Sequence, residues 1–258
     1  ISVPMFPRSS NKPMQAAAMR ACGLALEGEL LALASASHSG EDFHVTGVRK
    51  ILASAGLGED ALQCPPALPL DEAALWQFLG AGGRPDRVHM NCSGKHAAML
   101  ATCIAAGWPT QTYRDPDHPL QREIKTALGR LAGEAPAATG TDGCGAPLFA
   151  LSLTGLARAF GSLVLAAPGS AERTVADAVR AHPAWTSGTN RSERALHEAV
   201  PGLLIKSGAE GVQAFALADG RAGAVKIEDG TPRAIPAITV ALLRILGADA
   251  GDGVDRDA

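Results

Sequence analysis

The change in hydrophobic period near residue 200 is the feature that most limits the folds open to this chain. In residues 42–55, Val45, Val48, Ile51 and Leu52 share one face at helical spacing. After residue 200 the apolar residues form short runs typical of strands, at 203–205, 212–218 and 222–227. The sequence therefore predicts a helical part over about 42–200, followed by a sheet-forming part.

Two Asp-Gly pairs support this division. Asp219-Gly220 and Asp229-Gly230 follow predicted strands and indicate the tight turns of antiparallel hairpins. Further helices are predicted at 13–22, 71–79, 94–106, 119–132, 147–160, 170–181, 191–199 and 236–247. We expect an α+β fold with a mostly helical body, in which residues 203–247 and the N-terminal region supply an antiparallel sheet.

Composition limits the partners of the chain. Its 258 residues are 47% hydrophobic and 19% charged, which is typical of a globular protein. The net charge of −3 argues against nucleic acid or an anionic membrane, because either partner favours a basic face. No apolar run reaches the ~18 residues that a membrane-spanning helix needs.

Cysteine content and the first residues bear on the compartment. Five cysteines, an odd number in a chain of this size, argue against a disulfide framework and favour a reducing cytoplasm, although a single disulfide stays open. The chain begins at Ile1, and a dense motif follows without a signal peptide. We expect a cytoplasmic protein whose N-terminus is incomplete.

The first candidate for chemistry is an S-x-x-K motif at Ser9 and Lys12. A serine hydroxyl becomes a good nucleophile when a neighbouring base removes its proton, and a desolvated lysine can be that base. A spacing of three places both side chains on one face of a helical turn. Pro13 disfavours helical geometry at Lys12, so Ser9 to Lys12 are expected in a tight turn before a helix. A solvated helix start is the alternative.

Two later segments add to this motif. Lys206-Ser207-Gly208 ends a predicted strand, and S-x-x-K followed by K-[ST]-G is the motif order of the serine β-lactamase and penicillin-binding group. Ser37 lies between an apolar run and a predicted helix, where an active-site loop is expected. The alternatives are an exposed lysine at a strand end and an ordinary Ser/Gly turn.

A metal site is the third candidate. Cys92 and Lys95 are three residues apart at one helix start, and Cys144 lies in a Gly-rich loop. Thiolates favour zinc and similar ions, whereas a lysine binds metal only as a neutral amine. The alternatives are buried free cysteines or a Cys92–Cys144 disulfide. Neither a paired CxxC nor an HExxH signature is present.

Taken together, six segments resemble the thermolabile bacterial L-asparaginase II family of the Rhizobium inducible type. They lie in family order at residues 6–16, 36–41, 91–97, 114–119, 141–147 and 206–212, and the resemblance covers roughly residues 5–247. The resemblance implies hydrolysis of L-asparagine to L-aspartate and ammonia, and a homodimer. It also implies a fold akin to serine β-lactamases and glutaminases, in one domain spanning 1–258.

The resemblance also implies the site residues. Two Ser/Lys pairs are carried over onto this chain, Ser9 with Lys12 and Ser37 with Lys206. A zinc-type ion is expected on a second set of residues, with water completing its shell: Cys92, Lys95 and Cys144. Family members carry strands before the Arg-Ser-Ser segment, so the chain is expected to lack N-terminal strands of the sheet.

Three residues are weaker candidates for substrate binding. Arg8 and His96 are expected to contact the substrate, and Asp142 to contact it or support Lys95.

Two other functions stay open. One is another acyl-serine enzyme, either a glutaminase or a β-lactam-processing protein. The other is a non-catalytic metal-binding module in which Ser9 is idle.

Overall fold

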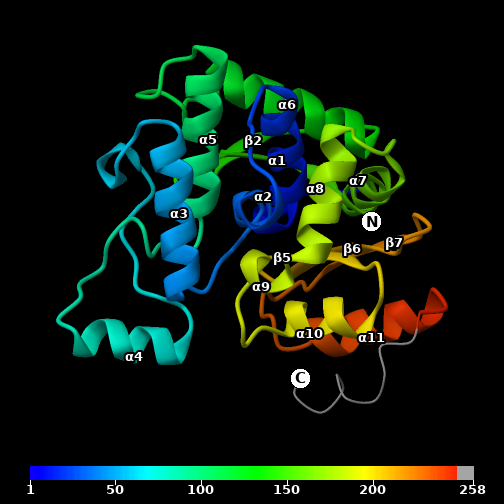
Figure 1. Cartoon of the computed structure of the whole chain (residues 1–258). Helices are drawn as coiled ribbons and strands as arrows, with labels where there is room; N and C mark the ends of the chain where they lie inside the picture. The colour runs from blue at the N-terminus through cyan, green and yellow to red at the C-terminus, as the bar shows by residue number, and fades with distance from the viewer. Residues whose placement is uncertain (249–258) are drawn as a thin grey trace.

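The computed structural model describes residues 1–248, so the last residues of the predicted unit 1–258 lie outside the described part. Figure 1 shows a helical body beside a small sheet, which confirms the predicted α+β class. The helices of the body are α1 (Lys12–Ala21), α2 (Gly28–Ala34), α3 (Asp42–Ser54), α4 (Glu72–Gly80), α5 (Ser93–Ala106), α6 (Pro119–Ala132), α7 (Leu153–Leu165), α8 (Ala171–Ala181) and α9 (Pro183–Thr186). Short 3-10 turns are η1 (Arg8–Asn11) and η2 (Glu59–Ala61).

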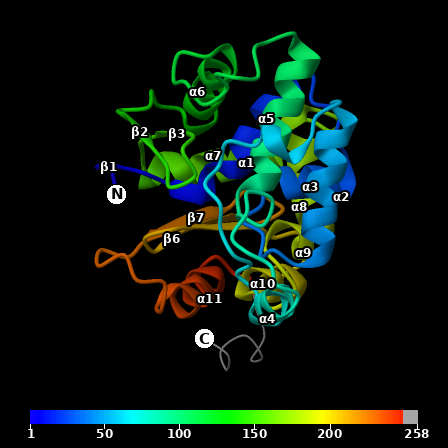
Figure 2. The same ribbon diagram turned by 90° about the vertical axis from the view of Figure 1, so that its left-hand side faces the viewer.

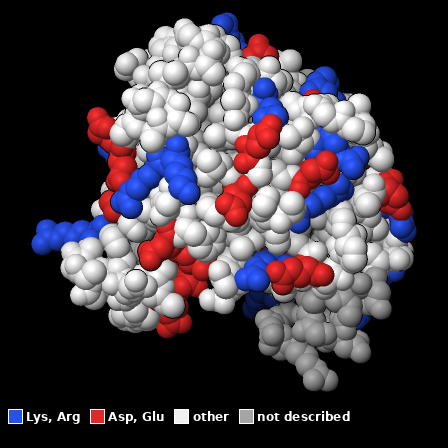
Figure 3. Space-filling model, in the orientation of Figure 1, with Lys and Arg blue, Asp and Glu red and all other residues white. Residues whose placement is uncertain are grey.

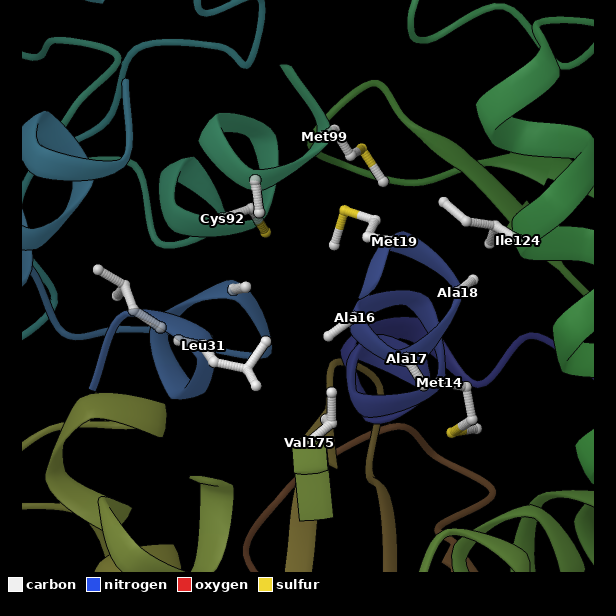
Figure 4. Close-up of a cluster of buried hydrophobic side chains, with 14 of the residues drawn as sticks. Met14, Ala16, Ala17, Ala18, Met19, Leu31, Cys92, Met99, Ile124 and Val175 are labelled. Atoms are coloured by element: carbon white, nitrogen blue, oxygen red, sulfur yellow. The ribbon is translucent and has the colours of Figure 1, made fainter. Parts of the chain in front are cut away.

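Helix α1 lies at the centre of the body. It contacts α2, α5, α6 and α8, and every residue from Lys12 to Met19 is buried. Figure 4 shows its Met and Ala side chains surrounded by apolar side chains from those helices: Leu31, Cys92, Met99, Ile124 and Val175. A helix that is buried all round is held firmly, so its first residue has a fixed position. That residue is Lys12.

The main sheet lies between the body and the last helices. It consists of β5 (Leu204–Gly208), β6 (Val212–Ala216) and β7 (Ala222–Lys226), antiparallel in the order β5-β6-β7. Figure 2 shows the body on one side of it, with α10 (Ser192–Ala199) and α11 (Ile235–Ile245) on the other. Gly220 and Gly230 have φ values of 90° and 78°, as the predicted Asp-Gly turns require.

The two faces of the sheet pack into different cores. Leu204, Val212 and Ala214 join the large core of the body, whereas Ile205 and Phe215 join a smaller core with α10 and α11. Side chains alternate along a strand. Lys206 is therefore on the same face as Leu204, and it points toward the body.

The segment 147–160 corrects one prediction. It was expected to be a helix starting at Pro147, but β3 (Pro147–Phe149) pairs with β2 (Thr139–Thr141), and β4 (Leu151–Ser152) pairs with β1 (Pro4–Met5). Helix α7 begins only at Leu153, where the Ser152 hydroxyl accepts the Gly155 N–H. Proline suits the first residue of a strand as well as the first turn of a helix, so Pro147 did not decide between them.

The other predicted helices lie within one or two residues of their observed bounds. Helix α2 was not predicted, because its apolar run is too short to show a helical period. Cys92, and not Ser93, is the residue before α5. The Cys92 thiol thus lies at the start of α5, and the Ser37 loop lies at the end of α2. Both of these helices pack on α1.

Charged side chains are interspersed on the face drawn in Figure 3, where Lys and Arg lie among Asp and Glu without one large patch of a single sign. This agrees with the small net charge of −3. Within residues 1–248, no helix combines the length and hydropathy that crossing a membrane requires.

Candidate functional site

The turn that carries Ser9 is held by ion pairs on both sides. Arg8 Nε lies 2.8 Å from Asp142 Oδ1, and Arg8 Nη1 lies 2.7 Å from Glu210 Oε1. Arg8 has a φ of 52°, in the left-handed region that residues other than glycine rarely adopt. Such strain persists where surrounding contacts enforce it and is common at functional sites. Ser9 follows it, half-buried, on η1.

Lys12 is the first residue of α1 and is fully buried. Its Nζ donates to the Ala36 carbonyl at 2.5 Å, the Ser37 hydroxyl at 3.0 Å and the Cys92 sulfur at 3.1 Å. The expected turn before the helix is present as η1, although α1 begins at Lys12 and not at Pro13. Lys12 thus joins the Ser37 loop to the candidate metal residues.

The Ser37 loop is attached to the start of α5. Its backbone N–H groups donate to Thr186 O from Ser37 and to Asn91 O from His38, each at 3.1 Å. The buried His38 ring accepts the Gly40 N–H on Nδ1, so its Nε2 donates to the Ser93 hydroxyl at 2.8 Å. These bonds fix the half-buried Ser37 hydroxyl next to Lys12.

The hydrogen bonds pair these residues differently from the predicted pairs. Among the described residues, Lys12 bonds to Ser37 and not to Ser9, and Lys206 bonds to Glu193 and not to Ser37. Lys206 is fully buried. It lies near enough to Lys12 for the two side chains to interact electrostatically. Lys12, Ser37 and Lys206 therefore belong to one neighbourhood.

Gly208 lets strand β5 approach the Ser9 turn. A Cβ at Gly208 would lie 2.5 Å from the Pro7 carbonyl oxygen and 3.1 Å from Ser10 N. Both are backbone atoms, so a side chain here would push η1 away from β5. The glycine of the Lys206-Ser207-Gly208 motif is required by this contact.

Replacing Gly208 with alanine is therefore expected to destabilise the fold by about 1–3 kcal/mol, as overpacking does. The midpoint of urea unfolding measures the change. Gly80→Ala is the matched control, because a Cβ there meets no atom within 4 Å. An unchanged midpoint for Gly208→Ala would contradict the close approach of the two segments.

The candidate metal residues converge in the buried region beyond Lys12. Lys95 Nζ donates to Cys144 Sγ at 3.1 Å, and the thiols of Cys92 and Cys144 are in hydrogen-bond contact. The hydrogen bond from Cys92 and the nearby Lys95 hold the pKa of Cys144 far below its usual range, although burial opposes this. The same contact and burial raise the pKa of Cys92 well above its usual range. No disulfide joins them, and all five cysteines are free.

Cys92, Lys95 and Cys144 are the donors that a zinc-type ion would have here. Within residues 1–248, no group of three His, Cys, Asp or Glu side chains is arranged to hold a metal, so Lys95 would be needed as third ligand. Burial lowers the pKa of Lys95, but Cys144 and Cys92 raise it above its usual value. Binding of an ion would therefore replace protons of Lys95 and Cys92, as is usual for thiol sites.

Two of the weaker candidates lie beside these ligands. His96 Nδ1 and the Tyr113 hydroxyl are 2.7 Å apart, and burial lowers the pKa of His96 to about 4. The other ring nitrogen, Nε2, is buried without a well-formed hydrogen bond, within interaction range of Cys144. Asp142 Oδ2 lies 3.5 Å from Cys144 Sγ. Asp142 thus links the metal residues to Arg8.

Three buried residues of this region were not predicted from the sequence: Glu193, Tyr113 and His38. Glu193 is the second residue of α10 and is 4% exposed. In the sequence it resembles any acidic residue in a first helical turn, which is common because it favours the helix dipole. Only the packing of α10 on β5 shows that this carboxylate is buried against Lys206.

The model of a family described as L-asparaginase II matches residues 1–256, essentially the whole chain. A search of curated proteins gave no match.

Proposed function

This chain belongs to the L-asparaginase II family, and we propose that it hydrolyses the side-chain amide of L-asparagine to L-aspartate and ammonia through a Ser/Lys centre. The observation that carries the proposal is the buried Lys12 amino group, which contacts Ser37 at 3.0 Å and Cys92 at 3.1 Å, one turn after Ser9. Buried lysines with specific polar partners are common at catalytic sites, where their proton or charge is used.

Ser9 is the proposed nucleophile and Lys12 its general base. Ser9 Oγ bonds to the amide carbon while its proton passes to the neutral amine of Lys12. The tetrahedral intermediate then expels ammonia, which takes that proton back from Lys12. An aspartyl ester on Ser9 remains. Water that is activated by Lys12 through the Ser37 hydroxyl hydrolyses this ester, and Lys206 supplies positive charge beside Lys12.

Cys92, Lys95 and Cys144 are the proposed holders of a zinc ion. When bound, zinc would supply a Lewis acid next to the Lys12 contact or would order the two loops that carry the thiols. His96, Arg8 and Asp142 remain predicted substrate contacts. Arg8 already pairs with Asp142 and Glu210, so its main effect is to fix the Ser9 turn.

Loss of one thiol is expected to abolish zinc binding. Cys144→Ser removes the thiolate that Lys95 contacts, and serine is a poor zinc ligand. Equilibrium dialysis against zinc, followed by metal analysis, measures the stoichiometry. Cys22→Ser is the control, because Cys22 is at the far end of α1 and is expected to keep the parent stoichiometry. Equal zinc contents in parent and Cys144→Ser would contradict the ligand assignment.

We also propose that the fold is akin to serine β-lactamases. The support is the S-x-x-K turn before the central helix α1, which lies against a Lys-Ser-Gly strand end in an antiparallel sheet. The proposed homodimer is tested by light scattering of the purified chain.

The proposed activity is tested by ammonia release from L-asparagine, with added zinc, beside L-glutamine and a chromogenic β-lactam. Faster turnover of L-asparagine supports the proposal. Preferential turnover of glutamine or the lactam would assign the site to another acyl-serine enzyme. Zinc binding without release of ammonia from either amide would favour the metal-binding module.

A further inference from the structure

Glu193 makes a closed set of hydrogen bonds with the end of strand β5. Its Oε1 accepts the Ser207 N–H at 2.6 Å and the Lys206 ammonium at 3.1 Å. Lys206 Nζ also donates to the Ser207 carbonyl oxygen at 3.0 Å. One carboxylate oxygen thus holds both the backbone and the side chain of the strand that faces the Ser9 turn.

Both charges of this pair are buried. The side chain of Lys206 is 0% exposed and that of Glu193 is 6% exposed. Replacing a buried ion pair with apolar residues is often neutral or stabilising, so such a pair is weak evidence for a role in stability. Loss of one partner, in contrast, leaves the other charge buried without compensation.

The other titratable groups around Lys206 do not replace Glu193. Burial lowers the pKa of Lys206 below its usual value, and Glu193 opposes this shift. Lys12 on α1 and Arg191 before α10 are cations, and both lower the pKa of Lys206 further. His197 on α10 is neutral near pH 7, because burial lowers its pKa to about 4. Burial raises the pKa of Glu193, but Lys206 and the Ser207 N–H outweigh it and bring the pKa to about 2. Glu193 is thus the charge that offsets the burial of Lys206.

We propose that Glu193 is a positioning residue for the reaction: it keeps Lys206 in the ammonium form and holds that charge beside Lys12. Lys206 then acts as a fixed cation and does not exchange protons with the substrate. The two buried lysines therefore have different roles. Lys12 contacts the hydroxyl of Ser37 and transfers protons, whereas Lys206 contacts a carboxylate and keeps its charge. This inference rests on the proposed function, in which both lysines belong to the reacting centre.

The charge state of Lys206 is measured directly by NMR of protein labelled with ¹³C at the lysine ε carbon. The Lys206 signal is assigned by its absence from Lys206→Met. In the parent, it is expected to show the ammonium form at pH 7, because the carboxylate favours the charged form. In Glu193→Gln, which keeps the size and one acceptor, the titration midpoint is expected to fall by about two units or more.

Kinetics test the consequence for the reaction. Glu193→Gln is expected to lower kcat for L-asparagine about 100-fold, as loss of a preorganised charge does, with little change in KM. Glu198→Gln is the control, because Glu198 is on the same helix but exposed and paired with Arg194. If Glu193 acts only through Lys206, Glu193→Gln combined with Lys206→Met is no slower than Lys206→Met alone.

Additive losses in the double variant would overturn the proposal, because they would mean a structural role. A Lys206 signal that titrates at the same pH in the parent and in Glu193→Gln would also overturn it. If Glu193→Gln does not fold, the parent alone provides the test, because a neutral Lys206 in the parent at pH 7 would also overturn the proposal. A parent without asparaginase activity would refute the proposed function alone, since the NMR titration does not depend on turnover.

Discussion

Replacing Lys12 with methionine is expected to lower kcat for L-asparagine about a thousand-fold, a loss typical of a missing general base. Methionine has a similar length but can neither accept the Ser9 proton nor donate to Ser37. The assay is steady-state ammonia release at saturating L-asparagine. Lys50→Met is the matched control, because Lys50 is exposed on α3 and is expected to keep the parent rate.

The same variant separates a catalytic role of Lys12 from a structural one. Lys12 is fully buried at the edge of the large apolar core, where a cation is costly. Methionine suits such a core, so the melting temperature of Lys12→Met is expected to equal or exceed that of the parent. A large fall in melting temperature together with a parent-like kcat would show that Lys12 is a structural residue.

Replacing Ser9 with alanine is expected to reduce kcat by at least about 10⁴-fold, the scale for loss of a nucleophile. Ser9 Oγ makes no hydrogen bond with another described residue, and Ser9 is half-buried. Its removal should therefore leave the melting temperature unchanged. The measurement is ammonia release, with circular dichroism to confirm the fold.

Ser37→Ala is the comparison for Ser9→Ala. Ser37 accepts from Lys12, so its loss is expected to slow hydrolysis of the ester more than its formation. A burst of ammonia followed by slow turnover would show this in rapid mixing. Parent-like activity in Ser9→Ala, with none in Ser37→Ala, would transfer the role of nucleophile to Ser37.

Local patterns predicted much of the fold. The period of residues 42–55 and the turns at Asp219-Gly220 and Asp229-Gly230 depend on near neighbours, and the structure confirms them. The strand at Pro147–Phe149 depends on pairing with Thr139–Thr141, which no local pattern records. Its residues form a strand because these hydrogen bonds outweigh the helical tendency of the sequence that follows.

For the candidate site, the sequence indicated residue types but not their partners. Lys12, Ser37 and Lys206, which lie far apart in the sequence, are brought into one neighbourhood by the fold. The bond from Lys12 to Ser37 and that from Lys206 to Glu193 join different elements of the fold. Each depends on how α1, α2 and α10 pack against their neighbours, which a spacing in the sequence does not contain.

The most direct test of the central claim is to identify the residue that carries the aspartyl ester. Ser37→Ala is mixed with L-asparagine, quenched with acid during turnover, digested with trypsin and analysed by mass spectrometry. Cleavage after Arg8 separates a peptide that begins at Ser9 from the peptide that contains position 37. We expect the ester on Ser9, and no ester in Ser9→Ala. Turnover of L-asparagine by the parent with no ester at Ser9, or with an ester on another residue, would contradict it.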